Sequence, residues 1–230
     1  QSAPLIDANI RALGFQTSDI RLILNSHAHY DHAGGIAALQ RASRATVAAS
    51  ASAARARQAG RPTPDDPQAE SSRPYPFPPV NRVRVVKDGE TIRAGDIRIT
   101  AHLTPGHTPG STAWSWRSCE GAQCVDVVYA DSLTSVSDDG FRFTGDASRP
   151  SVVDAFRRSI DKVASLPCDI VLAAHPGMVG LAQKLARRAA SSNTNPFIDP
   201  QGCRTYASSM RQQLEKRIAA ERAAGSEAQR

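Results

Sequence analysis

The stretch His27-Ala28-His29-Tyr30-Asp31-His32 decides how this sequence is interpreted. It follows an apolar run, residues 20–25, that predicts a β-strand. The first two histidines occupy alternate positions and therefore point to one side of the chain, while the aspartate and the third histidine follow in the turn. Zinc prefers imidazole nitrogens and carboxylate oxygens as ligands. Because the chain has only six histidines, three of them within six residues predict two adjacent metal sites rather than an ordinary polar strand end.

Two more histidines follow other predicted structural elements. His107 lies in the segment Thr-Pro-Gly-His-Thr-Pro-Gly-Ser, residues 104–111, where two prolines and two glycines predict a stiff turn. His175 follows an apolar run, residues 169–174, that predicts another strand. Ligands from three separate strand ends are thus expected to meet. His102 is expected to lie in a strand or beside a ligand rather than to bind metal.

Length and composition limit the classes of protein to consider. A chain of 230 residues, 40% hydrophobic and 22% charged, is expected to fold as one globular domain spanning 1–230. The net charge is +6, but basic residues are dispersed and aromatic residues are few, which disfavours a nucleic-acid partner. The densest basic stretch, 204–222, carries Leu214 and Ile218 on its other face and predicts a solvated helix. No run approaches the about 20 apolar residues that span a membrane, so no membrane partner is expected.

The order of predicted elements indicates an α/β protein. An amphipathic helix over 5–13 ends at Gly14, and Gly34-Gly35 forms a turn into a short helix. A strand over 46–49 and a helix over 52–59 follow. The proline-rich segment 61–80 predicts a long loop, either a flap over the metal sites or a surface wrap. Residues 82–130 alternate apolar and polar side chains and predict a strand meander.

The four cysteines bear on the cellular compartment. Cys119 and Cys124 flank a turn between two strand-like segments and can staple a hairpin. A bond between Cys168 and Cys203 would close a long loop and stabilise the fold by about 4 kcal/mol in the chain-entropy model. Two disulfides favour a secreted or periplasmic protein, and the alternative is four reduced cysteines in the core.

Three motifs together resemble those of the metallo-β-lactamase superfamily. They are His-Ala-His-Tyr-Asp-His, Pro-Gly-His-Thr-Pro-Gly-Ser and Ala-Ala-His-Pro, in this order and at roughly the family spacing. Within the superfamily, three other segments look like those of the subclass B3 enzymes, namely 111–116, 129–133 and 166–169. The resemblance covers nearly the whole chain.

The resemblance implies a zinc-dependent β-lactam hydrolase that acts on penicillins, cephalosporins and carbapenems through metal-bound hydroxide and confers antibiotic resistance. It implies two zinc ions per chain, the first bound by His27, His29 and His107 and the second by Asp31, His32 and His175. Asp31 would also orient the nucleophile, and Ser132 and Thr134 would contact the substrate. The pair Cys168 and Cys203 matches the subclass disulfide. A periplasmic monomer with a small β-lactam substrate is expected.

The implied fold is the αβ/βα sandwich of this superfamily. In the family, several strands precede the helix with which this chain begins, and they have no counterpart in the sequence. We therefore expect a first sheet that is incomplete at its N-terminal side, and we favour a truncated chain over a fold with an open half-sheet.

Two other functions compete with this interpretation. Superfamily hydrolases of the glyoxalase II, lactonase or phosphodiesterase kind carry an aspartate that bridges both metals, and Asp131 follows the corresponding strand. A bridging Asp131 would favour a thioester or lactone hydrolase, whereas Ser132 facing the metals would favour a β-lactamase. A zinc-binding protein without catalysis is the third interpretation.

Overall fold

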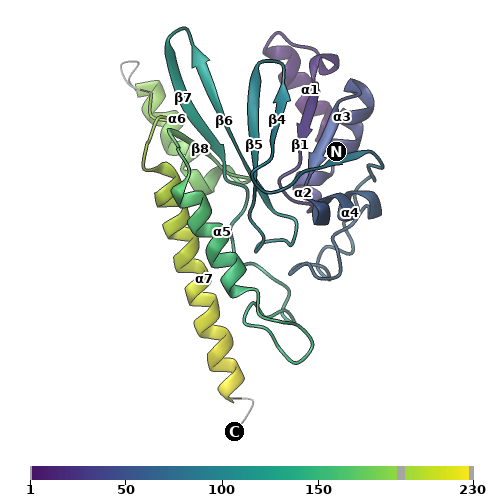
Figure 1. Cartoon of the computed structure of the whole chain (residues 1–230), viewed down its shortest axis with the longest axis vertical. Coiled ribbons are helices and arrows are strands. Elements are labelled where there is room, and N and C mark those ends of the chain that lie inside the picture. The colour runs from purple at the N-terminus through teal and green to yellow at the C-terminus, as the bar shows by residue number, and fades with distance from the viewer. Residues whose placement is uncertain (1, 191–194, 228–230) are drawn as a thin grey trace.

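Two β-sheets face each other, and helices cover their outer surfaces (Figure 1). This computed structural model describes residues 2–190 and 195–227, so the two ends of the predicted 1–230 domain lie outside the described residues. Helices α1 to α4 lie along one sheet, and the long helices α5 and α7 run side by side along the other. The expected αβ/βα sandwich is confirmed.

The first sheet contains three parallel strands in the order β1-β2-β3. Its strands are short because each carries only a brief apolar run between turn residues. The elements of this half are α1 (Ala3–Ala12), η1 (Thr17–Asp19), β1 (Leu22–Leu24), α2 (Tyr30–Ala33), α3 (Ile36–Ser43), β2 (Thr46–Ala49), α4 (Ala51–Ala59) and β3 (Val83–Val85).

The second sheet contains five strands in the order β4-β5-β6-β7-β8. Its first four strands are antiparallel, and β8 adds parallel to β7. The elements of this half are β4 (Thr91–Ala94), β5 (Ile97–Leu103), β6 (Thr112–Glu120), β7 (Gln123–Tyr129), α5 (Val153–Ser165), β8 (Ile170–Leu172), η2 (Pro176–Val179), α6 (Leu181–Ala190) and α7 (Gly202–Glu227).

Two sequence-based expectations about these elements are wrong. The meander does not begin at residue 82, because β3 pairs in parallel with β2 in the first sheet. Alternating side chains predict a strand but do not say which strand is its partner. The second half of the histidine cluster also differs from the predicted turn, since Asp31 and His32 lie in the short helix α2.

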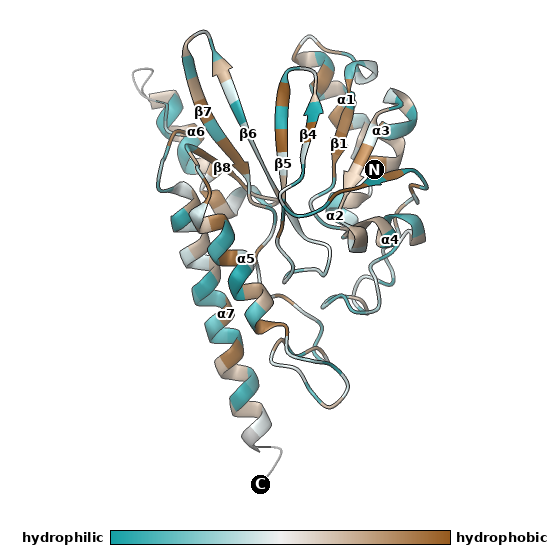
Figure 2. Cartoon of the chain, in the orientation of Figure 1, coloured by the Kyte–Doolittle hydropathy of each residue, from teal (hydrophilic) through white to brown (hydrophobic). Residues whose placement is uncertain are grey.

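Apolar residues, brown in Figure 2, recur along the strands, and buried apolar side chains form clusters between the layers. Trp114, Ile92 and Ile99 pack between the two sheets. Phe156 on α5 and Leu214 on α7 pack against the outer surface of the second sheet. The predicted division of the last helix holds in part: Ile218 is buried with Leu214, and Arg204, Lys216 and Arg222 are exposed. Arg211 and Arg217, however, are half-buried and pair with Asp161 and Glu221.

Both cysteine pairs are joined in the structure. Cys119 and Cys124 stand directly opposite each other at the end of the β6–β7 hairpin, and Cys168 joins the segment before β8 to Cys203 at the start of α7. The second bond therefore ties the last helix to the strand that leads to His175. None of the described helices has the length and apolar character needed to cross a membrane.

Candidate metal centre

Six side chains predicted to bind metal converge at one edge of the sandwich. They come from the segment after β1, the loop between β5 and β6, and the segment after β8. One ligand atom from each of His27, His29 and His107 lies within 4.8 Å of the other two, and the same holds for His27, Asp31 and His32. The six residues border one cavity of about 540 Å³, which is lined by His27, His29, Tyr30, Asp31, His32, Gln68, Ser71, Ser72, Tyr75, His107, Thr134, Val136, His175 and Met178.

Strand β6 holds the histidine segment in place from the side. The backbone N–H of Thr112 donates to the carbonyl of Ser26 (2.9 Å), and the indole N–H of Trp114 donates to the carbonyl of Asn25 (3.2 Å). The Asn25 side chain in turn donates to the carbonyl of His27 (2.8 Å). Because Trp114 is almost fully buried, these bonds fix the chain immediately before the ligands to the core.

His27 is held by a buried carboxylate. Its Nδ1 lies 2.7 Å from Oδ1 of Asp131, and both side chains are fully buried. Burial lowers the pKa of His27 below its ordinary value although Asp131 opposes this shift. Burial alone would raise the pKa of Asp131, but His27 and His107 lower it overall. The pair is thus a neutral imidazole donating from Nδ1 to a carboxylate, which leaves a lone pair on Nε2, a buried atom with no hydrogen-bond partner.

His107 is oriented by the segment that follows β7. Its Nδ1 lies 3.0 Å from the carbonyl oxygen of Thr134 and 3.1 Å from the Thr134 hydroxyl. Burial, with the neighbouring His27 and His29, lowers the pKa of His107 to about 3. The ring is therefore neutral and donates from Nδ1, so that Nε2 is left to accept a metal.

The turn around His107 depends on two close approaches of its backbone. A side chain at Gly106 would overlap the ring of Phe156, and one at Gly110 would overlap the backbone of Ala53. The two glycines of this motif therefore let the loop lie flat between α5 and α4, which seats His107 against the other histidines.

His29 has a partner that sequence reasoning did not identify. Its Nε2 lies 3.0 Å from Oδ1 of Asp66, a buried residue of the proline-rich loop. The same carboxylate oxygen accepts the backbone N–H of Gln68 (2.8 Å). The sequence offers little to identify Asp66 as this partner. Asp66 differs from its neighbour Asp65 only in being buried, which the sequence does not show.

The second group of ligands is more open. The ring Nε2 atoms of His32 and His175 lie 3.2 Å apart, and Oδ2 of Asp31 lies 3.1 Å from the first and 3.5 Å from the second. The hydrogen bond from His32, together with its charge, lowers the pKa of Asp31 although burial opposes this. The side chains of Asp31 and His175 are 57% and 50% exposed, which contrasts with the buried group around His27.

These distances fit zinc. Two ligands of a tetrahedral zinc with bonds of 2.0–2.1 Å are about 3.3 Å apart, close to the three separations among Asp31, His32 and His175. The buried lone pair of His27 fits the other group, because an orphaned buried polar atom is costly and a metal would satisfy it. All six side chains offer nitrogen or carboxylate oxygen, the donors that zinc accepts. The residues present therefore suit two zinc ions.

Asp131 adopts a strained backbone conformation beside this centre. Its φ is 59°, in the left-handed region that non-glycine residues rarely occupy. The Tyr206 hydroxyl of α7 donates to the Asp131 carbonyl (3.0 Å) and accepts from the N–H of Leu133 (3.1 Å). Burial raises the pKa of Tyr206, so the phenol stays protonated and can donate. The last helix thus holds the residue that orients His27, a contact absent from the sequence-based predictions.

The two predicted substrate contacts occupy different environments. Thr134 lines the cavity, whereas Ser132 is fully buried, does not line the cavity, and leaves its hydroxyl without a hydrogen-bond partner. Their roles toward substrate stay predictions. His102 lies on β5 and pairs with the Ser115 hydroxyl (2.8 Å) on the neighbouring strand, away from the six ligands.

The proline-rich loop borders the cavity. Gln68, Ser71, Ser72 and Tyr75 line it, and the ring of Tyr75 lies 6.2 Å from that of Tyr30. Residues 70 and 71 are tied to the segment after β7 through their backbone N–H groups, which donate to the carboxylate of Asp138 (2.7 and 3.2 Å). Of the two alternatives, a flap over the site agrees better with this placement than a surface wrap elsewhere.

Fold and site together define a metal-binding αβ/βα sandwich, and comparisons with known proteins specify its family. The sequence model of the Metallo-beta-lactamase superfamily matches residues 1–175. Among solved structures, the Rm3 metallo-beta-lactamase is 45% identical with a TM-score of 0.91, and the alignment covers 96% of this chain and 81% of that one.

Two further structures agree with this result. MEM-A1, a subclass B3 metallo-beta-lactamase isolated from a soil metagenome library, is 43% identical (TM-score 0.90; 96% of this chain and 83% of that chain). MIM-1 from Novosphingobium pentaromativorans is 40% identical (TM-score 0.87; 96% and 78%). This chain belongs to the metallo-β-lactamase superfamily, and its structure is closely similar to those of subclass B3 enzymes.

Proposed function

We propose that this protein is a dizinc hydrolase that opens the amide bond of β-lactam antibiotics. The observation that carries the proposal is the convergence of six zinc-type ligands on one cavity, in a chain 45% identical over 96% of its length to a metallo-β-lactamase. Penicillins, cephalosporins and carbapenems are the proposed substrates, and resistance to them is the proposed consequence. The cavity of about 540 Å³ lies within the range of small-molecule sites.

Two groups of residues would hold the metal. His27, His29 and His107 would bind the first zinc, and Asp31, His32 and His175 the second. Zinc supplies Lewis acidity, which lowers the pKa of water toward neutrality and polarises a carbonyl group. The protein's contribution is to fix the rings, since Asp131, Asp66 and Thr134 each engage the nitrogen of a histidine that is not needed for the metal.

Asp31 is the proposed catalytic carboxylate. It borders the cavity, it is ionised, and its side chain is more than half exposed. An ionised carboxylate at this place can accept a hydrogen bond from an attacking water and orient it toward a substrate carbonyl. Thr134 on the cavity wall, with Ser132 behind it, is proposed to position the substrate carboxylate.

The alternative as a thioester or lactone hydrolase has less support. It needs Asp131 to bridge two metals, but the Asp131 carboxylate contacts the far nitrogen of His27 and does not line the cavity. Ser132, which would favour a β-lactamase if it faced the metals, does not line the cavity either, so the similarity to subclass B3 structures is what favours β-lactam hydrolysis. A non-catalytic zinc protein is also disfavoured, because the group around Asp31 opens into a cavity rather than forming a closed shell.

The two disulfides support the proposal of a secreted, periplasmic protein, since such bonds persist in oxidising compartments. A monomer is proposed, because one chain supplies all six ligands.

The test is hydrolysis of a chromogenic cephalosporin and a carbapenem by the purified protein, with and without a zinc chelator, alongside a metal count. We expect turnover that the chelator abolishes and two zinc ions per chain. Two bound zincs without turnover of either compound would contradict β-lactam hydrolysis, and a thioester and a lactone assayed in parallel would show whether the alternative holds.

A further inference from the structure

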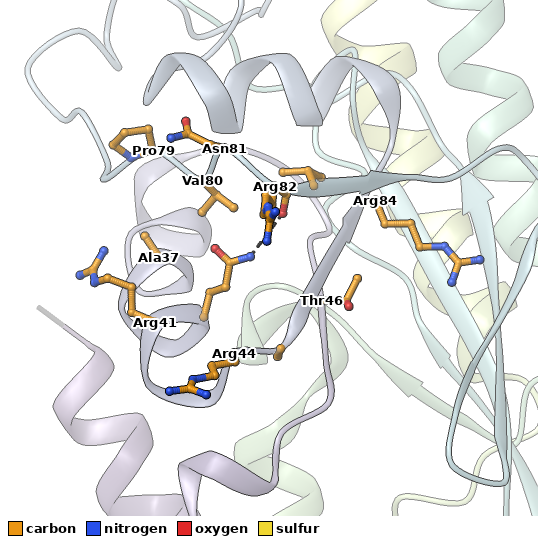
Figure 3. Close-up of a pocket in the computed structure, with 12 residues that line it drawn as sticks. Ala37, Arg41, Arg44, Thr46, Pro79, Val80, Asn81, Arg82 and Arg84 are labelled. Atoms are coloured by element: carbon orange, nitrogen blue, oxygen red, sulfur yellow. Dashed lines mark hydrogen bonds between the residues drawn. The ribbon is translucent and has the colours of Figure 1, made fainter.

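A second cavity lies at the far end of the first sheet from the metal centre (Figure 3). It occupies about 860 Å³ between α3 and the amino ends of β2 and β3, and Ala37 and Val80 are buried at its floor. The metal ligands follow the carboxyl end of β1, so about 10 Å of strand separates the two places.

Four arginines line this cavity, and no acidic residue does. Arg84 pairs with Glu90 (3.0 Å). The side chains of Arg41, Arg44 and Arg82 are exposed and form no ion pair or hydrogen bond within residues 2–190 and 195–227. Three guanidinium groups without such a partner therefore lie along the border of this cavity, Arg41 and Arg44 on one wall and Arg82 on the other, and together they raise the positive potential there.

The helix dipole explains only part of this cluster. Arg41 and Arg44 lie at the C-terminal end of α3, where cations are favoured. Arg82 comes from the segment before β3 on the other wall, and no helix end accounts for it. Arg44 also has a φ of 60°, a conformation that glycine or asparagine adopts more readily at the end of a helix.

We propose that this cavity binds a ligand with two or more phosphate groups. Guanidinium groups bind phosphate oxygens through paired hydrogen bonds, and arginine serves this purpose better than lysine. The cavity is large enough for several such groups, and the amide of Asn81 and the hydroxyl of Thr46 add neutral donors at its border. Phosphate groups of this kind occur on soluble bisphosphates and on the headgroups of anionic lipids, and the site fits their common chemistry.

The experiment uses the zinc-loaded protein with one soluble and one lipid probe. Binding of fructose 1,6-bisphosphate is measured by calorimetry, and binding to cardiolipin vesicles is measured by cosedimentation against phosphatidylcholine vesicles. The test variant replaces Arg41, Arg44 and Arg82 by glutamine. The control variant makes the same change at Arg158, Arg187 and Arg188, which are exposed and lie outside this cavity.

We expect the test variant to bind at least tenfold more weakly than the control variant, with its circular dichroism spectrum and cephalosporin hydrolysis retained. Binding of the bisphosphate alone would identify a soluble ligand, and binding of cardiolipin alone would identify a lipid headgroup. If neither probe binds, or if both variants weaken binding equally, the proposal is overturned. Should the triple variant unfold, Arg82→Gln alone against Arg158→Gln provides the same comparison.

Discussion

The two groups of metal ligands lie side by side but are built differently. His27, His29 and His107 are buried, and each has one ring nitrogen held by a hydrogen-bonding partner from elsewhere in the fold. His175 and Asp31 are half exposed, and within the described part of the chain their side chains make polar contacts with each other and with His32.

If both groups bind zinc as proposed, this difference predicts that they bind it with unequal affinity. The buried group is oriented before a metal arrives, so little conformational entropy is lost on binding. In the exposed group, the bound ion itself would have to fix the orientation of the side chains. We therefore expect the buried group to keep zinc when a chelator removes it from the exposed group.

The largest effect is expected from Asp31→Ala, which removes the carboxylate of the exposed group. Turnover of a chromogenic cephalosporin should fall by about 10²- to 10³-fold, because the second metal and the orientation of the nucleophile are both lost. The thermal midpoint of the metal-free protein should stay unchanged, since the side chain is largely exposed. A metal count should decrease from two to one. Hydrolysis at the wild-type rate would refute the role of Asp31.

A weaker effect is expected from Asp131→Asn, which keeps the shape of the side chain that supports His27 but removes its charge. Zinc affinity of the buried group should fall by about 10- to 100-fold, measured by competition with a chromophoric chelator. The exposed group should be nearly unaffected. If instead the affinity of the more weakly bound zinc falls, Asp131 supports the weaker site. The assignment of the tighter zinc to the buried group is then wrong.

Asp66→Asn tests the support of His29 and should weaken the buried zinc by about tenfold. The loss is expected to be smaller than that at Asp131, because Asp131 is fully buried and its charge also acts on His107, whereas Asp66 lies in a loop that borders solvent. Asp65→Asn is the matched control, because its side chain is exposed and adjacent in sequence. Equal effects of the two changes on zinc competition would show that the loop's charge matters rather than its contact with His29.

The smallest effect is expected from Glu221→Gln on α7, which is remote from both groups. The Glu221 carboxylate accepts the backbone N–H groups of Phe143 (3.1 Å) and Thr144 (2.9 Å) and pairs with Arg217 (2.7 Å). The change should lower the free energy of unfolding at pH 7 by about 1 kcal/mol and leave the zinc affinity of both groups unaltered. Thermal denaturation and zinc competition measure the two quantities.

The same variant gives a pH dependence. Burial would raise the pKa of Glu221, but the backbone of Thr144, Arg217 and the backbone of Phe143 lower it below its ordinary 4.5. A carboxyl with a lowered folded-state pKa stabilises the fold above pH 4.5, and this contribution is lost as the pH falls through the folded-state value. The difference in thermal midpoint between wild type and variant should therefore narrow below about pH 4.5. A constant difference down to pH 3 would contradict this origin.

The sequence predicted the parts of this structure that local patterns encode. Histidines after apolar runs predicted strand ends, and the structure brings all six predicted ligand residues to one cavity. Cysteines on either side of a turn predicted a hairpin bond, and Cys119 lies opposite Cys124. Such features depend on spacing over a few residues, or on motifs that a known family shares.

Features that depend on distant contacts were missed. The alternation in β3 predicted a strand, but its parallel pairing with β2 depends on the crossover connection through α4, which contacts β3. Asp66 supports a histidine 37 positions away, and nothing in the order of residues separates it from Asp65. Tyr206 contacts Asp131 across 75 positions, in a helix whose sequence predicts only an amphipathic surface.

Because of the Tyr206 contact, mutations in the last helix can also reduce this activity. A single codon change near the C-terminal end of the chain alters the support of a strained residue that itself orients a histidine in the first motif. Variants that differ only in the last helix can therefore differ in zinc affinity and in turnover, even when all six proposed metal ligands are identical.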